Sequence, residues 1–328
     1  MPARKEKSVS IRPIKQLVKA QPTMEGAGVH LRRAFGFGKT EEFDPFLLLD
    51  DFRNDVPDQY LAGFPWHPHR GIETITYVLA GTVDHGDSLG NEGSITAGDV
   101  QWMTAGSGIV HQEMPRGDGE GRMHGFQLWA NLPASLKMTA PRYQDILAAD
   151  IPEIIDDDGT KVRVICGNLW GVSGPVDGIA ADPNYVDISV PPGTRKSIPV
   201  ETTRHAFAYV FAGAGEFRDA SDPLATPTDH VTEGSELADA DDLRQRRAAI
   251  DTRSGSGASV ADNRSLVLFD RGDEVVVQAG KEGIRFLLVS GEPLKEPVAW
   301  HGPIVMNTRE QLQQAFSELQ DGTFLENE

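Results

Sequence analysis

Four side chains that can bind metal occur as two closely spaced pairs. His67 and His69 belong to an HPH motif, and His111 and Glu113 belong to an HQE motif further along the chain. In a β-strand, residues i and i+2 point to the same face, so two strands could aim all four side chains at one point. Three imidazoles and a carboxylate suit first-row divalent metals and leave one or two positions open to water or substrate.

The segments around both motifs are predicted to be short strands. Residues 72–79 are rich in β-branched and aromatic side chains and end at a turn, and residues 100–103 form an apolar run after the tight turn at 97–99. His30, in the alternating segment 29–35, is expected to be an exposed strand residue. The ligand set has no thiolate, which argues against a closed structural zinc site. We therefore expect an open site, used for catalysis or for reversible ligand binding.

Size, charge and cysteine content restrict the class of protein. The chain has 328 residues, enough for two domains, and a net charge of −18, which disfavours direct binding to nucleic acid or to an anionic membrane. No stretch approaches eighteen apolar residues, and the first ten residues lack the apolar segment of a signal peptide. Cys166 is the only cysteine and is expected to lie in a buried strand. We expect a soluble, cytoplasmic protein.

The second half of the chain repeats the pattern of the first half. From residue 161 on, short strands alternate with turns that contain Gly and Pro, as in a β-sandwich or barrel. The sequence AFAYVFAGAG at 206–215 parallels ETITYVLAGT at 73–82, which suggests two related barrels in tandem. Where the first half has HPH, the second half has the segment ETTRH at 201–205, which contains one histidine, His205. Only the first barrel is therefore expected to hold a metal.

Two further segments of the second half differ from the barrel pattern. Residues 218–264 are dominated by Asp, Ala, Ser, Gly and Arg, and we interpret them as an acidic, low-complexity insertion. Near the C-terminus, residues 307–319 are predicted to form a helix with Asn307 as its N-cap. Its apolar stripe, formed by Leu312, Phe316 and Leu319, is expected to pack on a barrel.

Several other conspicuous residues allow two interpretations. His85 and His124 could line the mouth of the first barrel or relay protons, but a histidine in a packed strand is more often an ordinary hydrogen-bonded residue. A group of bulky side chains could form an aromatic wall for a planar substrate or could equally be barrel core. This group consists of Trp102, Met103, Phe126 and Trp129.

The order HPH, Glu73, Gly98-Asp99 turn and HQE matches the two-part signature of the cupin barrel, a double-sheet jelly roll. Four segments, HPHRGIET, GDVQWMTAGSGIVHQE, HGFQLWANLP and HGPIVMNT, resemble the pirin family and together span nearly the whole chain. The resemblance implies an all-β protein of two tandem cupin barrels, residues 1–145 and 146–328, with a short C-terminal helix. It also implies one Fe(II) in the first barrel, at the positions of His67, His69, His111 and Glu113, and none in the second. Because many cupins use the glutamate at the position of Glu73, we expect Glu73 to be an alternate ligand or to orient a histidine or a bound water.

The resemblance to pirins implies two alternative functions. Some pirins show quercetin 2,3-dioxygenase activity, which implies a planar, flavonol-like hydroxy-ketone and O2 as substrates and Glu113 as the base for the flavonol hydroxyl. Other pirins are iron-dependent, redox-sensing regulators that bind a transcription factor or a metabolic enzyme, which implies a protein partner. A metal-dependent isomerase of sugars or keto acids is a third candidate on the same scaffold. Copper or nickel would compete for such a site, so the expectation of iron depends on the resemblance.

Overall fold

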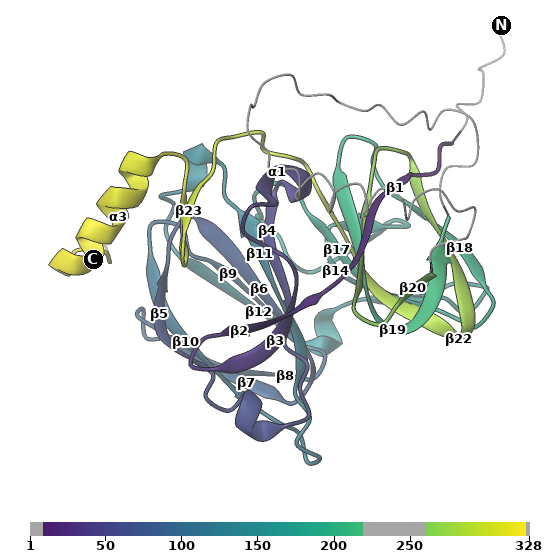
Figure 1. Ribbon diagram of the computed structural model, residues 1–328, viewed down its shortest axis with the longest axis horizontal. Coiled ribbons are helices and arrows are strands. Elements are labelled where there is room, and N and C mark those ends of the chain that lie inside the picture. The colour runs from purple at the N-terminus through teal and green to yellow at the C-terminus, as the bar shows by residue number, and fades with distance from the viewer. Residues whose placement is uncertain (1–8, 219–259, 326–328) are drawn as a thin grey trace, which may run out of the picture.

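The computed structural model describes residues 9–218 and 260–325, which form two β-barrels side by side (Figure 1). The first barrel consists of a seven-stranded and a four-stranded sheet, and one nine-stranded sheet curls into the second barrel. The described residues include two α-helices, α1 (Thr40–Phe43) and α3 (Arg309–Asp321). The predicted all-β fold with a short C-terminal helix is confirmed. The predicted insertion at 218–264 lies largely outside the described residues.

The two sheets of the first barrel face each other across its interior. The larger sheet has the strand order β12-β9-β6-β11-β4-β3-β2, and the smaller sheet has the order β5-β10-β7-β8. The strands of the larger sheet are β2 (Gln21–Glu25), β3 (Val29–Phe35), β4 (Phe46–Asp51), β6 (Ile72–Ala80), β9 (Val100–Thr104), β11 (His124–Asn131) and β12 (Arg142–Ile146). Those of the smaller sheet are β5 (Phe64–His69), β7 (Thr82–Asp87), β8 (Glu92–Thr96) and β10 (Ile109–Arg116).

The second barrel has the strand order β1-β21-β19-β22-β17-β14-β13, with β18 paired to β22 and β20 paired to β19. Its strands are β1 (Ile14–Lys19), β13 (Glu153–Ile155), β14 (Lys161–Cys166), β17 (Asn184–Val190), β18 (Arg195–Pro199), β19 (His205–Phe217), β20 (Val260–Asp262), β21 (Ser265–Phe269) and β22 (Glu274–Gly291). Two short hairpins complete the fold: β15 (Asn168–Leu169) with β16 (Val172–Ser173), and β23 (Ala299–His301) with β24 (Ile304–Met306). Aliphatic and aromatic side chains fill this barrel, among them Val164, Ile188, Val277 and Phe286.

Segments from each half of the chain join the other half. Strand β1, near the N-terminus, pairs with β21 of the second barrel. Near the C-terminus, Ile304 of β24 forms a bridge with Arg70 of the first barrel, and helix α3 lies beside that barrel (Figure 1). Arg70 also donates to Glu318 of α3 at 2.6 Å. The C-terminal segment is therefore part of the barrel that carries the HPH and HQE motifs.

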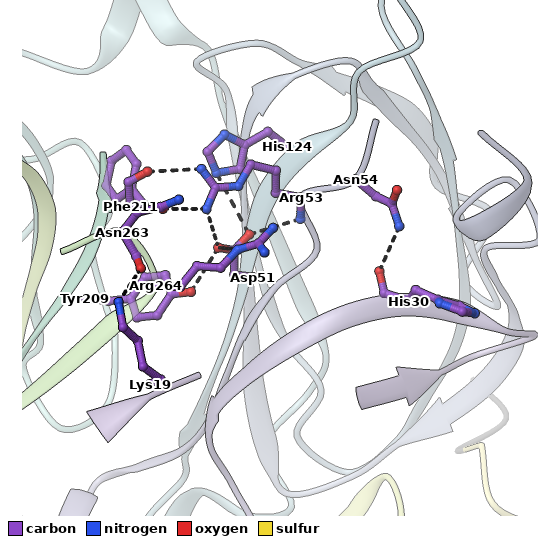
Figure 2. A network of polar contacts seen from close by, with 10 residues as sticks. All are labelled: Lys19, His30, Asp51, Arg53, Asn54, His124, Tyr209, Phe211, Asn263 and Arg264. Carbon is purple, nitrogen blue, oxygen red and sulfur yellow. Dashed lines mark hydrogen bonds and ion pairs between the residues drawn. The ribbon is translucent and has the colours of Figure 1, made fainter. Parts of the chain in front are cut away.

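A buried polar network joins the two barrels, and Figure 2 shows it from close by. Asp51, at the end of β4, is fully buried and accepts hydrogen bonds from the Tyr209 hydroxyl at 2.9 Å and from Arg53 Nη2 at 3.3 Å. Arg53 also donates to the carbonyl of Phe211 at 3.0 Å. Because Tyr209 and Phe211 belong to β19, the carboxylate of Asp51 connects the first barrel to the second.

The C-terminal helix differs from the prediction at its first residue. Thr308, not Asn307, is the N-cap, and Thr308 and Gln311 form a reciprocal capping box. The predicted apolar stripe is confirmed, because Leu312, Phe316 and Leu319 pack against the cluster that includes β24. No helix among the described residues is long and apolar enough to cross a membrane.

Candidate metal centre

Three histidines converge inside the first barrel. Strand β5 carries His67 and His69, and the register places His111 of β10 opposite His67. The Nε2 atom of His67 lies 3.0 Å from Nε2 of His69 and 3.0 Å from Nε2 of His111. His69 and His111 are buried, and His67 is half-buried. The structure thus brings together the three histidines that the sequence singled out, in an arrangement that could hold a metal ion.

Backbone carbonyls orient two of the three rings. Nδ1 of His67 lies 2.9 Å from the Pro65 carbonyl oxygen, and Nδ1 of His69 lies 3.1 Å from the Pro303 carbonyl oxygen. Because a carbonyl only accepts, each Nδ1 carries the proton and each Nε2 is left with a lone pair. Two lone pairs at 3.0 Å repel each other, and a cation bound by both nitrogens would remove that repulsion. The donor set therefore fits a metal ion.

Burial keeps these rings in the form that binds metal. It lowers the pKa of His69 to about 3, and it lowers the pKa of His111 well below its ordinary value. Both imidazoles are therefore neutral at physiological pH. A neutral imidazole can donate its lone pair to a metal without first losing a proton.

Glu113 lines the same cavity as His67 and His69. It stands two residues after His111 on β10, so both side chains point into the barrel. Its Oε1 atom accepts a hydrogen bond from the Thr76 hydroxyl at 2.9 Å, and burial raises its pKa to about 7. A carboxyl group with that pKa can take up or release a proton near neutral pH.

The structure does not bring Glu73 to the histidines. Glu73 lies on β6, three residues before the cavity residue Thr76. Because side chains alternate between the two faces along a strand, the side chain of Glu73 points to the opposite face of the sheet from Thr76. There it accepts a hydrogen bond from Thr104 at 2.8 Å, on the face whose neighbours Ile75 and Tyr77 belong to the core shared by the two barrels. Its position gives no support to the predicted role as a ligand or as a residue that orients one.

A cavity of about 570 Å³ opens beside the histidines, and aromatic rings form one of its walls. The ring of Trp129 lies 5.1 Å from His69 and 6.0 Å from Trp300, and Trp300 lies 5.4 Å from Phe37 (all between ring centroids). Trp129 is thus the one member of the predicted bulky group that lines this cavity. The other three are core residues: Trp102, Met103 and Phe126.

The remaining predicted histidines are not among the residues that line this cavity. His85 is buried on β7 opposite Glu113 in the strand register, so its side chain points to the same face as Glu113, and its ring stacks on Tyr143. His124 belongs to the network of Figure 2, 3.9 Å from Asp51, and burial lowers its pKa to about 4. His30 is exposed on β3, as predicted.

Sequence reasoning did not identify the cavity residues contributed by the C-terminal segment. Trp300 and Pro303 belong to the β23–β24 hairpin and lie more than two hundred residues from the HPH motif in sequence. The motif HGPIVMNT at 301–308 was the only available signal, and nothing in it indicates which barrel the hairpin contacts. The residues that support Glu113, Thr76 and Gln127, were missed because they lie on strands whose register is not visible in the sequence.

Comparison with known proteins agrees with this architecture. The family model "Pirin" matches residues 28–130, and the model "Pirin C-terminal cupin domain" matches residues 185–325. A pirin-like protein of Caulobacter vibrioides is 45% identical over 96% of this chain and 99% of its own length. This chain belongs to the pirin family. The predicted family and the predicted fold of two cupin barrels are both confirmed.

Two other pirin relatives carry names that indicate an activity. A Pseudomonas aeruginosa protein named "Putative quercetin 2,3-dioxygenase" is 37% identical and covers 95% of this pirin and 97% of its own chain. A crystal structure of a quercetin 2,3-dioxygenase from Acinetobacter baumannii superimposes with a TM-score of 0.78 at 28% identity, over 96% of this chain and 99% of that one. The names of these two relatives therefore indicate an oxidoreductase activity for those proteins.

Proposed function

We propose that this pirin is a mononuclear iron protein that cleaves flavonols with O2, as a quercetin 2,3-dioxygenase does. In this proposal His67, His69, His111 and Glu113 hold one Fe(II). The observation that carries the proposal is the convergence of three neutral Nε2 donors on a cavity with an aromatic wall. The names of the two relatives described above support the choice of reaction and substrate.

When bound, the iron supplies an open coordination site at which a hydroxy-ketone and O2 can meet. The surrounding residues bind and orient the substrate. Trp129 and Trp300 present aromatic faces on which a planar ring can stack. Glu113 is buried and lines the cavity, so its carboxylate is placed to accept the proton of the flavonol 3-hydroxyl. The overall reaction consumes one flavonol and one O2 and releases a depside and carbon monoxide.

One observation favours a second function, that of an iron-dependent redox-sensing regulator. The carbonyl of Pro303 contacts the ring of His69, and the next residue after His69, Arg70, donates to Glu318 on helix α3. A shift of residues 69 and 70 would therefore reach the C-terminal segment through the His69–Pro303 and Arg70–Glu318 contacts. A protein partner such as a transcription factor or a metabolic enzyme would bind the surface of that segment in one oxidation state of the iron and not in the other.

Metal analysis combined with oxygen consumption tests the proposal. We would purify the protein under argon, measure its metal content, and then measure O2 uptake with quercetin for the wild type and for His69→Ala. The proposal predicts about one iron per chain and quercetin-dependent O2 uptake, both lost in His69→Ala because removal of one histidine leaves too few ligands. His30→Ala, at an exposed position on β3, should retain both. Bound iron without any consumption of quercetin would contradict the dioxygenase function and favour the regulator.

A further inference from the structure

A single row of polar side chains crosses the floor of the cavity. The strand register pairs Thr76 of β6 with Gln127 of β11, Gln127 with Asp50 of β4, and Asp50 with Arg33 of β3. Side chains of paired residues on antiparallel strands point to the same face, so these four stand in line. All four line the cavity. We refer to Thr76, Gln127, Asp50 and Arg33 as the polar row.

The floor on both sides of the polar row is apolar. The next residues on the same face of these strands are two positions away from the row. On one side of the row they are Trp129 and Leu48, and on the other side they are Leu31 and Phe52. Polar groups in apolar surroundings are destabilising unless they are hydrogen-bonded. A row of this kind inside a cavity therefore marks the positions at which a mostly apolar ligand would meet polar partners.

The near end of the row supports Glu113. The Thr76 hydroxyl lies 2.9 Å from Oε1 of Glu113 and 2.7 Å from Oε1 of Gln127. Because the oxygen of Gln127 accepts from Thr76, the side-chain NH2 group of Gln127 is left to donate a hydrogen bond to an oxygen atom of a ligand in the cavity.

The far end of the row is an ion pair with an excess of negative charge. Arg33 binds Asp50 through two parallel hydrogen bonds, Nε to Oδ1 at 2.9 Å and Nη2 to Oδ2 at 2.8 Å, and Nη2 also lies 2.8 Å from Glu25. Because Asp50 already occupies the fork of the guanidinium, an incoming carboxylate cannot bind Arg33 in the same way. Each oxygen of Asp50 keeps a second lone pair, and Asp50 is only 5% exposed. This end therefore accepts hydrogen bonds from neutral donors and repels anions.

The length of the row fits an aromatic ligand of two or three rings. Neighbouring strands lie about 4.8 Å apart, so Asp50 stands about 9.6 Å across the sheet from Thr76, which contacts Glu113. A planar ligand held at the histidines by one end could reach Asp50 with its other ring. Its path would follow the aromatic wall formed by Trp129 and Trp300.

We propose that Asp50 and Gln127 determine the specificity of the cavity by binding phenolic hydroxyls on the substrate ring that points away from the histidines, and that Arg33 positions Asp50 for this contact. The substrate class is then a neutral, polyhydroxylated, planar aromatic compound, and carboxylated or sulfated analogues are excluded. The orientation of the substrate rests on the proposed function, whereas the binding preference does not. The three residues position substrate, Arg33 through Asp50, and take no part in bond cleavage.

Binding of flavones tests this proposal without any turnover. Flavone, chrysin and luteolin carry none, two and four ring hydroxyls, and all three lack the 3-hydroxyl of a flavonol. We would titrate each into the full-length protein under argon by calorimetry. When two successive ligands of this series are compared, the one whose additional hydroxyls lie next to Asp50 should bind roughly 10- to 100-fold more tightly, because these hydroxyls donate to a charged acceptor. In Asp50→Asn that gain should disappear, while the affinity for unsubstituted flavone stays close to that of the wild type.

A matched control separates recognition from general destabilisation. Asp187 forms the same kind of buried, two-bonded pair with Arg285 in the second barrel, at 3.0 and 2.6 Å. Asp187→Asn should therefore reduce stability to a similar extent and retain the preference for luteolin. If Asp50→Asn does not fold because Arg33 loses its partner, the double variant Arg33→Gln/Asp50→Asn removes both charges together and should show the same loss of preference.

The outcomes distinguish this inference from the proposed function. A protein that binds luteolin in an Asp50-dependent manner but does not consume O2 with quercetin would retain the inference and lose the dioxygenase function. A protein that consumes quercetin but gains no affinity from the added hydroxyls, or gains the same affinity in Asp50→Asn, would retain the function and lose the inference. Absence of binding by all three flavones would also overturn the inference.

Discussion

At the scale of single residues, Glu73 is an acid that the fold buries without an ion pair to any residue that the structure describes. It is 1% exposed, Thr104 donates to one of its oxygens, and the other oxygen has no hydrogen-bond partner among the described residues. Burial raises its pKa from 4.5 to about 7. The folded protein therefore holds this proton more tightly than the unfolded chain does. Between pH 4.5 and pH 7, Glu73 makes the free energy of unfolding fall as the pH rises.

We predict that Glu73→Gln stabilises the protein at high pH. The neutral amide removes the penalty of ionising a buried acid, which amounts to up to roughly 3 kcal/mol at pH 8 and nearly nothing at pH 4.5. Urea unfolding of metal-free wild type and variant across this range measures the difference. Glu113, whose pKa is also raised to about 7, is present in both proteins and cancels from that difference. Parallel stability curves would contradict the prediction, and loss of bound metal in the variant would restore Glu73 as a ligand candidate.

The same residue shows what sequence could and could not establish. His67 and His69 share one strand, so their common face followed from the spacing alone. Glu73 lies beyond the turn at Gly71, where φ is +77° and an added Cβ would lie 2.0 Å from the Val305 carbonyl oxygen. Alternation along a strand does not continue through such a turn. The face of the sheet on which Glu73 lies therefore could not be predicted from the spacing of residues, because it depends on how the chain folds at this turn.

At the scale of elements, a buried lysine adds to the contacts between the β23–β24 hairpin and the first barrel. Lys137 is 1% exposed, and its Nζ donates to the carbonyl oxygens of Gly71 and Val305 at 2.8 and 2.9 Å and to Asn131. Gly71 follows the HPH motif, and Val305 belongs to β24. Lys137 therefore joins the metal-binding region to the hairpin whose Pro303 carbonyl orients His69.

Lys137→Met should consequently weaken both folding and metal binding. Three buried acceptors lose their donor, which we expect to lower the free energy of unfolding by about 3 kcal/mol. If the hairpin moves, the Pro303 carbonyl no longer orients His69, which should reduce the affinity for metal roughly 10- to 100-fold. Thermal unfolding and competition with a chelator measure the two effects. Lys39→Met removes only the exposed Lys39–Glu42 pair and should change stability by less than about 1 kcal/mol.

Elements were predicted well where periodicity defines them and less well where geometry does. Strands with alternating or apolar sequences were located, whereas β22 continues through residues 278–283, where the sequence QAGKEG interrupts the apolar pattern. Asn307 and Thr308 are both suitable N-caps, and the folded chain selects Thr308, whose side chain accepts a hydrogen bond from the Gln311 N–H. The polar row required the register of four strands, because its members are far apart in sequence. Pairing of this kind cannot be derived from one chain's spacing.

At the scale of the whole molecule, one of the hydrophobic clusters spans both barrels. Phe126 of the first barrel packs edge to face on Tyr209 of the second at 5.8 Å, and the Tyr77 hydroxyl donates to Asp187 at 2.8 Å. Both pairs belong to or border a single buried cluster that draws on both halves of the chain. The division into domains at residues 1–145 and 146–328 stays a prediction. It places β1 and β21, which are paired, in different domains, and it does the same with Arg70 and Ile304.

We therefore predict that neither residues 1–145 nor residues 146–328 fold when expressed alone. The first fragment lacks the hairpin and α3 that contact Arg70, and the second lacks β1, which leaves β21 as an unpaired edge. Each would also expose its part of the shared core, a large apolar surface that favours aggregation. Near-ultraviolet circular dichroism and size-exclusion chromatography should show aggregated or loosely packed fragments when each is alone. Co-expression should give a complex of both with the unfolding transition of the full chain. A sharp, cooperative transition in either isolated fragment would contradict the prediction and show that one barrel is independently stable.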